Sequence, residues 1–333
     1  MADREEISRG LANGAEQKDI AVSIGRCESV VSRDIARHGG RGNYRAHSAD
    51  AGARLSRGRP RCRKLDADPV LRERVTADLR RAWSPQQISG RLCRERNRGE
   101  TGMSVSHEAI YTWMYALPKG ELAEMEIALR TGRTRRQPRG RARSKGARII
   151  GMTSISQRPA EAAGRKVPGH WEGDLVIGKA GKTAMGTLVE RKSRYLVPVA
   201  LPDGRDSAAV CDGVIESVRD MPAGLLRSIT WDQGAEMARH AALTLASDIP
   251  VFFAHAHSPW ERGTNENTNG LLREYFPKGT DITGDIRYLN RVADEINDRP
   301  RAILGFRTPA EVFAELLLDD NSGDNLSSVA STG

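Results

Sequence analysis

Two acid-free basic stretches divide this chain and limit how it can fold. Residues 54–64 (RLSRGRPRCRK) contain six basic residues, and residues 130–148 (RTGRTRRQPRGRARSKGAR) contain nine. Glycine, proline and repeated like charges do not form a packed core. The stretches therefore predict folded segments joined by basic linkers. These linkers could bind DNA phosphates along the backbone, or they could simply be solvated. A length of 333 residues is enough for two or three domains.

Charge is unevenly distributed between the two halves. Residues 1–164 carry 33 Lys and Arg against 19 Asp and Glu, and the remainder carries 19 against 24, so +14 and −5 add to the net +9. A basic half favours a polyanionic partner. No apolar run reaches the roughly 18 residues of a membrane span, and residues 1–20 lack the apolar stretch of a signal peptide. We therefore expect a cytoplasmic, nucleoid-associated protein that binds nucleic acid and no membrane.

The first 45 residues have the pattern of a helix-turn-helix unit. Apolar residues recur at helical spacing, Gly25 suits the turn, and a glycine pair ends the third helix. A small helical bundle with a solvated charged face is the alternative. In the helix-turn-helix interpretation the third helix faces a major groove, with arginines near phosphates. The candidate DNA contacts are Arg26, Ser29, Ser32, Arg33, Arg37 and Arg41.

A second helical segment begins near Pro69. Its middle helix has a predicted capping box, with Ser84 as N-cap, Pro85 at the first helical position and Gln87 three residues after the cap. The apolar residues of its last helix recur at core spacing. Only the basic flanks suggest that this segment contacts DNA, so its role stays open.

After Pro168 the pattern changes from helices to strands. The elements follow the order β-β-β-α-β-α-β-α, which predicts a mixed sheet with helices on its faces. Asp174 falls within the first strand and Asp232 at the end of the fourth. A polar helix expected from about Pro259 carries Glu266.

The three acids are candidate ligands for a divalent metal. Carboxylate oxygens are the ligands that Mg²⁺ and Mn²⁺ prefer. Two such ions, about 3.5–4 Å apart, catalyse phosphoryl transfer. Spacing alone does not single out Asp174, Asp232 and Glu266 in a chain with 43 acidic residues.

The residues around the acids add a family resemblance. HWEGDLVIG, TWDQGAE and SPWERGTNENTNGLLREYFPKGT resemble the three catalytic blocks of the insertion-sequence-thirty family of bacterial DDE transposases. The resemblance extends to the amino-terminal block, to WSPQQISGRL with IYTWMY, and to NDRPRAILGFRTPAEVF, and it covers most of residues 4–315. The chain departs from the family pattern at residues 26–31 (RCESVV). This departure concerns which terminal-repeat sequence the protein recognises and does not affect the chemistry.

The resemblance implies a transposase that binds terminal inverted repeats and cuts and joins DNA. Asp174, Asp232 and Glu266 would bind Mg²⁺ or Mn²⁺, two ions per site, and joining two ends implies at least a homodimer. No covalent intermediate is needed, which agrees with four scattered cysteines that we interpret as reduced thiols rather than zinc ligands. The alternatives are a catalytically silent helix-turn-helix regulator, and a metal-dependent nuclease or integrase of the same superfamily.

Other residues of the catalytic blocks are candidates for supporting roles. His170 and Glu172 are either groups that support the metal ligands or part of the strand surface. Lys, Arg and Asn side chains commonly contact phosphates and bases, although the asparagines could instead cap structure. The candidate DNA contacts beside the metals are Arg262, Asn265, Asn267, Asn269, Arg273 and Lys278.

The expected fold is an α/β catalytic core, a ribonuclease H-like mixed sheet flanked by helices, preceded by all-α helix-turn-helix domains. The expected segments are a helix-turn-helix domain at 1–45, a basic linker at 46–68, a second helical domain at 69–128, a basic linker at 129–164, the catalytic domain at 165–318 and a flexible tail at 319–333.

Overall fold

The computed structural model describes residues 2–58, 62–118, 120, 149–256 and 258–330, without the side chains of the last eleven. It divides into two compact units, Met1–Arg63 and Lys64–Gly333. Within the described ranges, no helix combines the length and apolar character that a bilayer-spanning segment requires.

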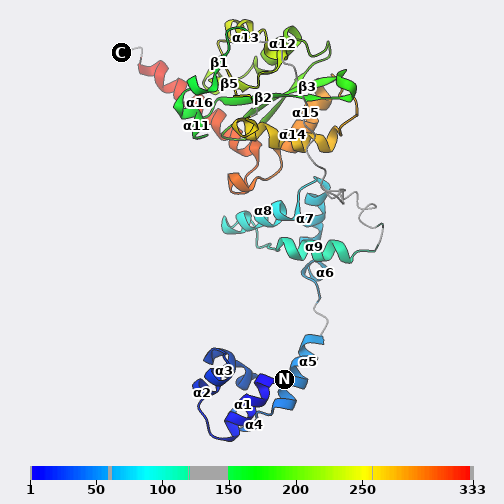
Figure 1. The fold of residues 1–333 in the computed structure, drawn as a ribbon, viewed down its shortest axis with the longest axis vertical. Helices are drawn as coiled ribbons and strands as arrows, with labels where there is room; N and C mark the ends of the chain where they lie inside the picture. Colours follow the sequence, from blue (N-terminus) through cyan, green and yellow to red (C-terminus); the bar gives the residue numbers. More distant parts are fainter. Residues whose placement is uncertain (1, 59–61, 119, 121–148, 257, 331–333) are drawn as a thin grey trace. The chain divides into compact units, whose positions relative to one another are not determined.

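The first unit is entirely helical (Figure 1). Gly25, at φ +63°, makes the turn between the second and third helices, as the sequence predicts. The buried face contains Ile7, Ile20, Ala21, Val31, Ile35, Tyr44 and Ala49. The helices are α1 (Ala2–Ala12), α2 (Gln17–Ser23), α3 (Glu28–Arg37), α4 (Gly40–Asn43) and α5 (Ala46–Gly58).

Residues 46–58 differ from the expected basic linker, because they form helix α5. Ala49 is fully buried, and the Asp50 carboxylate accepts a hydrogen bond from Arg4 Nη1 at 3.0 Å. Arg4 also pairs with Asp34 of α3, 3.2 Å away. These contacts join α5 to α1 and α3, and local composition does not reveal them. Residues 59–61 of the expected linker lie outside the described residues.

Residues 64–116 form a helical segment with its own apolar core. The predicted capping box is confirmed: Gln87 N donates to Ser84 Oγ at 3.3 Å, and Ser84 N donates to Gln87 Oε1 at 2.8 Å. The helices are α6 (Lys64–Ala67), α7 (Pro69–Arg80), α8 (Pro85–Asn97) and α9 (His107–Ala116). The end of the expected second domain and most of the second expected linker lie outside the described residues.

The catalytic segment contains the predicted mixed sheet. Strand order is β1-β6-β5-β2-β3-β4, with β2, β3 and β4 antiparallel neighbours and β2, β5, β6 and β1 parallel neighbours. The strands are β1 (Thr153–Ser154), β2 (His170–Ile177), β3 (Ala184–Glu190), β4 (Leu196–Ala200), β5 (Ser228–Trp231) and β6 (Val251–Phe253). From β2 onward, the order of strands and longer helices matches the expected series.

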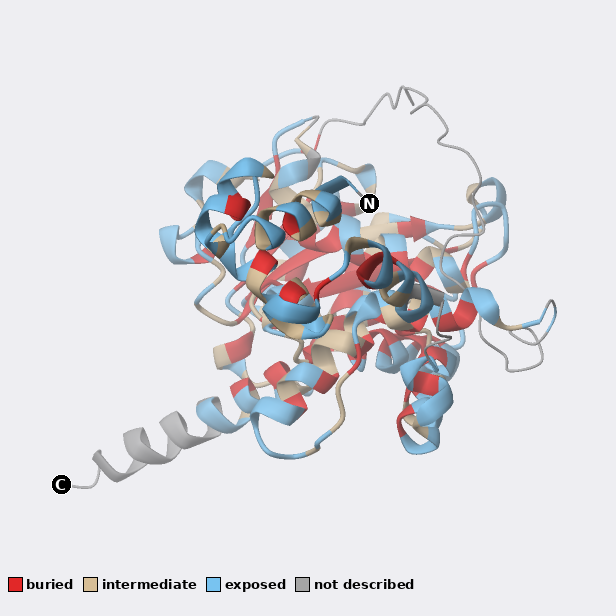
Figure 2. Ribbon diagram, turned by 90° about the horizontal axis from the view of Figure 1, so that it is seen from below, coloured by how far each residue is buried: buried red, intermediate tan, exposed pale blue. Residues whose placement is uncertain are grey.

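Helices cover both faces of this sheet (Figure 1). One core lies against α12 (Ser207–Val218) and α13 (His240–Ser247), and the other against α14 (Gly263–Tyr275) and α15 (Ile286–Asn297). Adjacent strand residues enter opposite cores: Leu188 faces the first and Val189 the second. Buried residues accordingly follow the strands (Figure 2). The predicted ribonuclease H-like fold is confirmed.

The boundaries of the catalytic segment differ from expectation at both ends. β1 pairs with β6, and Ile149 enters the first core, so residues 149–164 belong to the catalytic fold rather than to a linker. Helix α16 runs over Pro309–Ala330, so most of the expected tail is helical; no proline interrupts it.

The short helices of this segment are η1 (Ile155–Gln157), α11 (Ala160–Ala163), η2 (Lys179–Gly181), η3 (Ala223–Leu225), η4 (Ala235–Met237), η5 (Pro259–Arg262) and η6 (Ala302–Leu304).

Candidate active site

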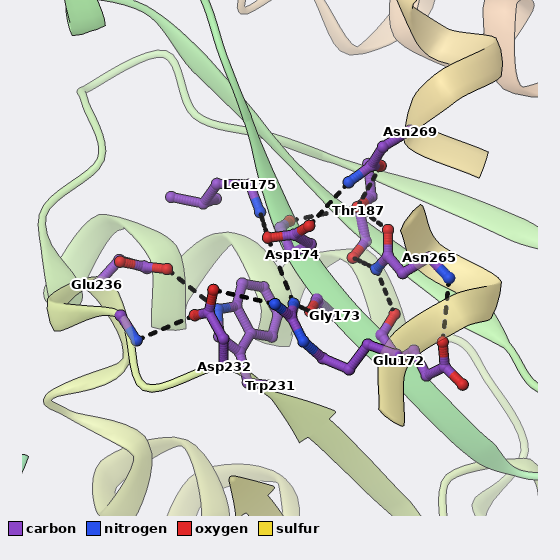
Figure 3. Close-up of polar contacts among 12 residues, drawn as sticks. Glu172, Gly173, Asp174, Leu175, Thr187, Trp231, Asp232, Glu236, Asn265 and Asn269 are labelled. Atoms are coloured by element: carbon purple, nitrogen blue, oxygen red, sulfur yellow. Dashed lines mark hydrogen bonds and ion pairs between the residues drawn. The ribbon is translucent and has the colours of Figure 1, made fainter. Parts of the chain in front are cut away.

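Two of the candidate acids meet where neighbouring parallel strands leave the sheet. β2 pairs Glu172 with Thr230 of β5, and the acids lie two residues beyond that pair on each strand. Asp174 therefore comes level with Asp232, the first residue after β5, and Figure 3 shows the two carboxylates close together. Parallel strands deliver their ends to one edge of a sheet, which is how residues far apart in sequence form one site.

A glycine between the buried residues of β2 allows this approach. A Cβ atom on Gly173 would lie 2.0 Å from a ring carbon of Trp231, so the ring of Trp231 occupies the space that any other residue would fill. Trp171 and Trp231 are both buried, as the sequence predicts. A glycine inside a strand often marks a position where another part of the protein packs closely against the backbone. Gly173 in the expected strand could therefore have indicated this close packing from the sequence.

A positive charge lies between the two carboxylates. The Arg262 guanidinium is 3.4 Å from Asp174 Oδ1 through Nη1 and 3.0 Å from Asp232 Oδ2 through Nη2, and its side chain is only 15% exposed. Nη1 also donates to the Gly173 carbonyl oxygen at 2.9 Å. Burial raises the pKa of the Asp174 carboxyl, Arg262 opposes the shift, and the charge of Asp232 adds to it. The pair thus has the charge and the hard oxygen donors that suit a cation.

An amide network on α14 orients Asp174 (Figure 3). Asn269 Nδ2 donates to Asp174 Oδ2 at 2.9 Å. The Thr187 hydroxyl, on β3, donates to Asn265 Oδ1 at 3.0 Å and lies 3.2 Å from Asn269 Oδ1. Asn265 Nδ2 in turn donates to the Glu172 carbonyl oxygen at 2.8 Å. These bonds give partners to the side-chain amides of Asn265 and Asn269, which would be costly to bury without them.

Glu266 is exposed in the first turn of α14. It precedes Asn269 by three residues, so both lie on the same side of the helix, and the amide of Asn269 contacts Asp174. Among the residues described, no three His, Cys, Asp or Glu side chains are close enough to hold one metal ion. The structure therefore brings Asp174 and Asp232 together and leaves Glu266 on the neighbouring helix face.

Glu172 anchors the start of α14. Its side chain is fully buried, and Oε2 accepts hydrogen bonds from Thr264 N at 2.9 Å and Asn265 N at 3.0 Å. Oε1 accepts from Arg191 Nε at 2.9 Å. A carboxylate at a helix N-terminus satisfies free amides and opposes the positive end of the helix dipole. Glu172 thus fixes the helix that carries Glu266.

His170 is the first residue of β2, four residues before Asp174, and its contacts stabilise the fold. Its Nδ1 is 2.7 Å from Ser228 Oγ, and its Nε2 is 3.4 Å from Glu161 Oε1. Burial lowers the pKa of its imidazole. No contact described for His170 reaches Asp174 or Asp232.

Glu236 is a further acid beside the pair that the sequence interpretation did not single out. Its Oε1 accepts from Trp231 Nε1 at 3.3 Å (Figure 3). Burial raises the pKa of Glu236, and the charges of Asp232 and Asp174 add to this shift. Gly234 N donates to Asp232 Oδ1 at 3.0 Å. Its position four residues after Asp232, in the block TWDQGAE, could have indicated from the sequence that Glu236 lies near the site.

The candidate DNA contacts on and beside α14 divide into residues with bonds inside the fold and residues that are exposed. Asn265 is fully buried and makes internal bonds, so it does not face DNA, contrary to expectation. Arg262 and Asn269 hold the aspartates, and Arg273 donates to the carbonyl oxygens of Ile177 and Phe276. All of these partners except Phe276 are at least 30 positions away in sequence, so residue type alone suggested DNA contacts. Asn267 and Lys278 are exposed.

The amino-terminal candidates lie at the surface of the first unit. Arg26, Arg33 and Arg37 line a groove of about 560 Å³. Arg41 donates to the carbonyl oxygens of residues 14 and 15. Ser29 is exposed and Ser32 half-buried.

Comparison with known proteins supplies the family. Residues 164–259 match the model of the integrase core domain, a family that acts with divalent metal ions. The chain is 42% identical over 320 residues to the transposase for insertion sequence element IS1086 of Cupriavidus metallidurans, covering 95% of this chain and 94% of that one. It is 40% identical to transposase InsI for element IS30A of Escherichia coli K12, covering 94% and 82%. It is 32% identical to the transposase for element IS4351 of Bacteroides fragilis, covering 94% of each.

These similarities extend over both units and the site just described. Transposases act on DNA, which agrees with the basic half of the chain. The chain belongs to the IS30 family of DNA transposases, polynucleotidyl transferases with a ribonuclease H-like integrase core.

Proposed function

We propose that Asp174, Asp232 and Glu266 bind two Mg²⁺ or Mn²⁺ ions and that this site cuts and joins DNA at the terminal inverted repeats of an insertion sequence. The main support is the pair of aspartates with the Arg262 guanidinium between them, because the protein places a cation where the chemistry needs one. Glu266 supplies the third carboxylate from the helix face that reaches Asp174 through Asn269.

Other residues of the site orient the metal-binding acids. When bound, the ions would activate the attacking oxygen and stabilise the leaving oxygen. Asn269 orients Asp174, the Gly234 amide orients Asp232, and Glu172 fixes α14. Asn267 and Lys278, which are exposed, are the proposed contacts to the DNA backbone.

The first unit is the proposed repeat-binding module. Its second and third helices flank a glycine turn, and four arginines and two aspartates line one groove beside them. In helix-turn-helix proteins the helix after the turn enters the major groove. Ser29, Ser32 and Arg33 on α3 are the proposed base-reading side chains, with Arg26, Arg37 and Arg41 near phosphates.

Removal of residues 1–63 should abolish preference for the repeat. Because the specific contacts lie on this unit, we expect the ratio of repeat to random-duplex affinity, about 10³ or more for specific binders, to fall to near one. A competitor-titrated gel shift measures this ratio. Full-length binding should also weaken with salt at a slope of about −0.9 per neutralised phosphate. Undiminished preference in the truncated chain, with an unchanged unfolding midpoint for the rest, would refute the assignment.

Joining two ends requires two active sites, so we propose at least a homodimer. Strand joining after cutting distinguishes a transposase from a nuclease of the same superfamily. Repeat binding without cutting under any metal would indicate a silent regulator.

A further inference from the structure

Helix α8 contacts the segment that leads into α16 through two interlocked helix caps. Gln87 Oε1 caps α8, and its Nε2 donates to the Pro300 carbonyl oxygen at 2.8 Å. Glu311 caps α16 by accepting from Thr308 N, and the same carboxylate binds Arg91 of α8. Each cap residue therefore bonds both to its own helix terminus and across the contact.

The Arg91–Glu311 pair has a specific geometry. Arg91 Nη1 lies 2.9 Å from Oε2 and Nη2 lies 2.7 Å from Oε1, which is a bidentate arrangement. The Arg91 side chain is 18% exposed, so solvent screens the pair less than it would at the surface. Arg91 Nε also donates to Glu95 at 2.9 Å, which holds the guanidinium in place. Bidentate pairs select one orientation as well as adding stability.

A close approach of backbone and ring completes the contact. A Cβ atom on Gly90, in the middle of α8, would lie 2.2 Å from two ring carbons of Phe306. Phe306 has φ +61°, a conformation that costs energy for any residue but glycine. A bridge between Arg301 and Arg307 closes its loop. The loop thus presents a strained aromatic residue to the one helix position that has no side chain.

The contact links parts of the chain that have separate cores. The helical segment α6–α9 has its own apolar cluster, and none of its members belongs to the two clusters of the catalytic sheet. The covalent connection from α9 to the catalytic segment passes through residues 119–148. The α8 contact supplies a second, direct connection, made by Gln87, Gly90 and Arg91 on one side and Pro300, Phe306 and Glu311 on the other.

We propose that this contact fixes the position of the helical segment α6–α9 relative to the catalytic acids, so that DNA bound along that segment is cut at one defined phosphodiester. The cutting itself rests on the proposed function. These six residues are positioning residues, since none of them contacts Asp174 or Asp232. If the contact is broken, Asp174, Asp232 and Glu266 are unchanged, but α8 no longer determines which phosphodiester of the DNA they cut.

A size-exchange cycle tests the proposal on the full-length chain. Alanine favours helix over glycine, so Gly90→Ala would stabilise α8 if the contact were unimportant. We expect the opposite, a lower unfolding midpoint, because the new methyl group displaces the Phe306 ring. Phe306→Ala in the same chain should raise the midpoint again, because it makes room for that methyl group. Gly102→Ala, where a Cβ meets nothing within 4 Å, is the matched control and should change nothing.

Mapping cuts on an end-labelled duplex that carries the flanking ends of the chain's own element gives the functional readout. We expect Gly90→Ala to lower the fraction of cuts at the wild-type position at least tenfold, and the double variant to recover it. Unchanged cut position and midpoint in Gly90→Ala, or strictly additive effects in the double variant, would overturn the proposal. Absence of cutting by the wild-type chain would count against the proposed function, and the unfolding cycle would still decide whether the contact exists.

Discussion

Asp232→Asn should abolish DNA cleavage while leaving repeat binding nearly unchanged. Asparagine keeps the size of the side chain and can still accept the bond from Gly234 N, which is 3.0 Å away. It loses the charge that attracts a cation and pairs with Arg262. We expect the cleavage rate to fall on the order of a thousandfold or more, comparable to the loss of a strong transition-state contact.

Single-turnover cleavage and gel-shift titration of the same preparation measure the two effects. Asp220→Asn, the same change at an exposed position, is the matched control and should cut normally. Equal loss of binding and cleavage in Asp232→Asn would show that the residue acts through the fold and not through the metal.

Glu172→Gln should be the most destabilising single change around the site. Glutamine has a single acceptor oxygen, so it can accept from the two α14 amides or from Arg191 Nε but not from both, and in either case the buried guanidinium of Arg191 loses its charged partner. Removing one member of a buried ion pair costs about 3–5 kcal/mol. In a domain of this size that corresponds to an unfolding midpoint lower by roughly 6–20 °C.

Thermal unfolding of full-length protein checks this expectation. Glu100→Gln is the control, since Glu100 pairs with Arg98 at the surface, and such pairs contribute about 1 kcal/mol or less. Comparable midpoints for the two variants would contradict the anchoring role. Cleavage by Glu172→Gln below its midpoint should also be reduced, because α14 positions Glu266.

Local pattern predicted the parts of the structure that depend on local causes. Runs of β-forming residues after Pro168 predicted the strands, and Ser84 predicted a cap that the structure confirms. Asp174 and Asp232 were predictable as neighbours because parallel strands deliver their ends to one edge. The identity of the family came from the sequence blocks around the acids, and the comparisons confirm it.

The remaining features depend on partners that local sequence does not specify. Asn265 was expected to face DNA, but its partner Thr187 lies 78 positions away and encloses it in the fold. Arg262 was also expected at DNA, yet it lies against two aspartates. Helix α5 was missed because its stability comes from Arg4 binding Asp50, 46 positions away, and composition describes only the stretch itself.

Strand cleavage and joining on a labelled duplex with the element's own ends is the most direct test of the account. The assay compares the wild-type chain with Mg²⁺, the wild-type chain with EDTA, and Glu266→Gln with Mg²⁺. We expect cut and joined products only in the first reaction, because all three carboxylates and the metal are required. Cutting that persists in EDTA or in Glu266→Gln would contradict the assignment of these acids, and clean repeat binding without cutting under any metal would indicate a regulator.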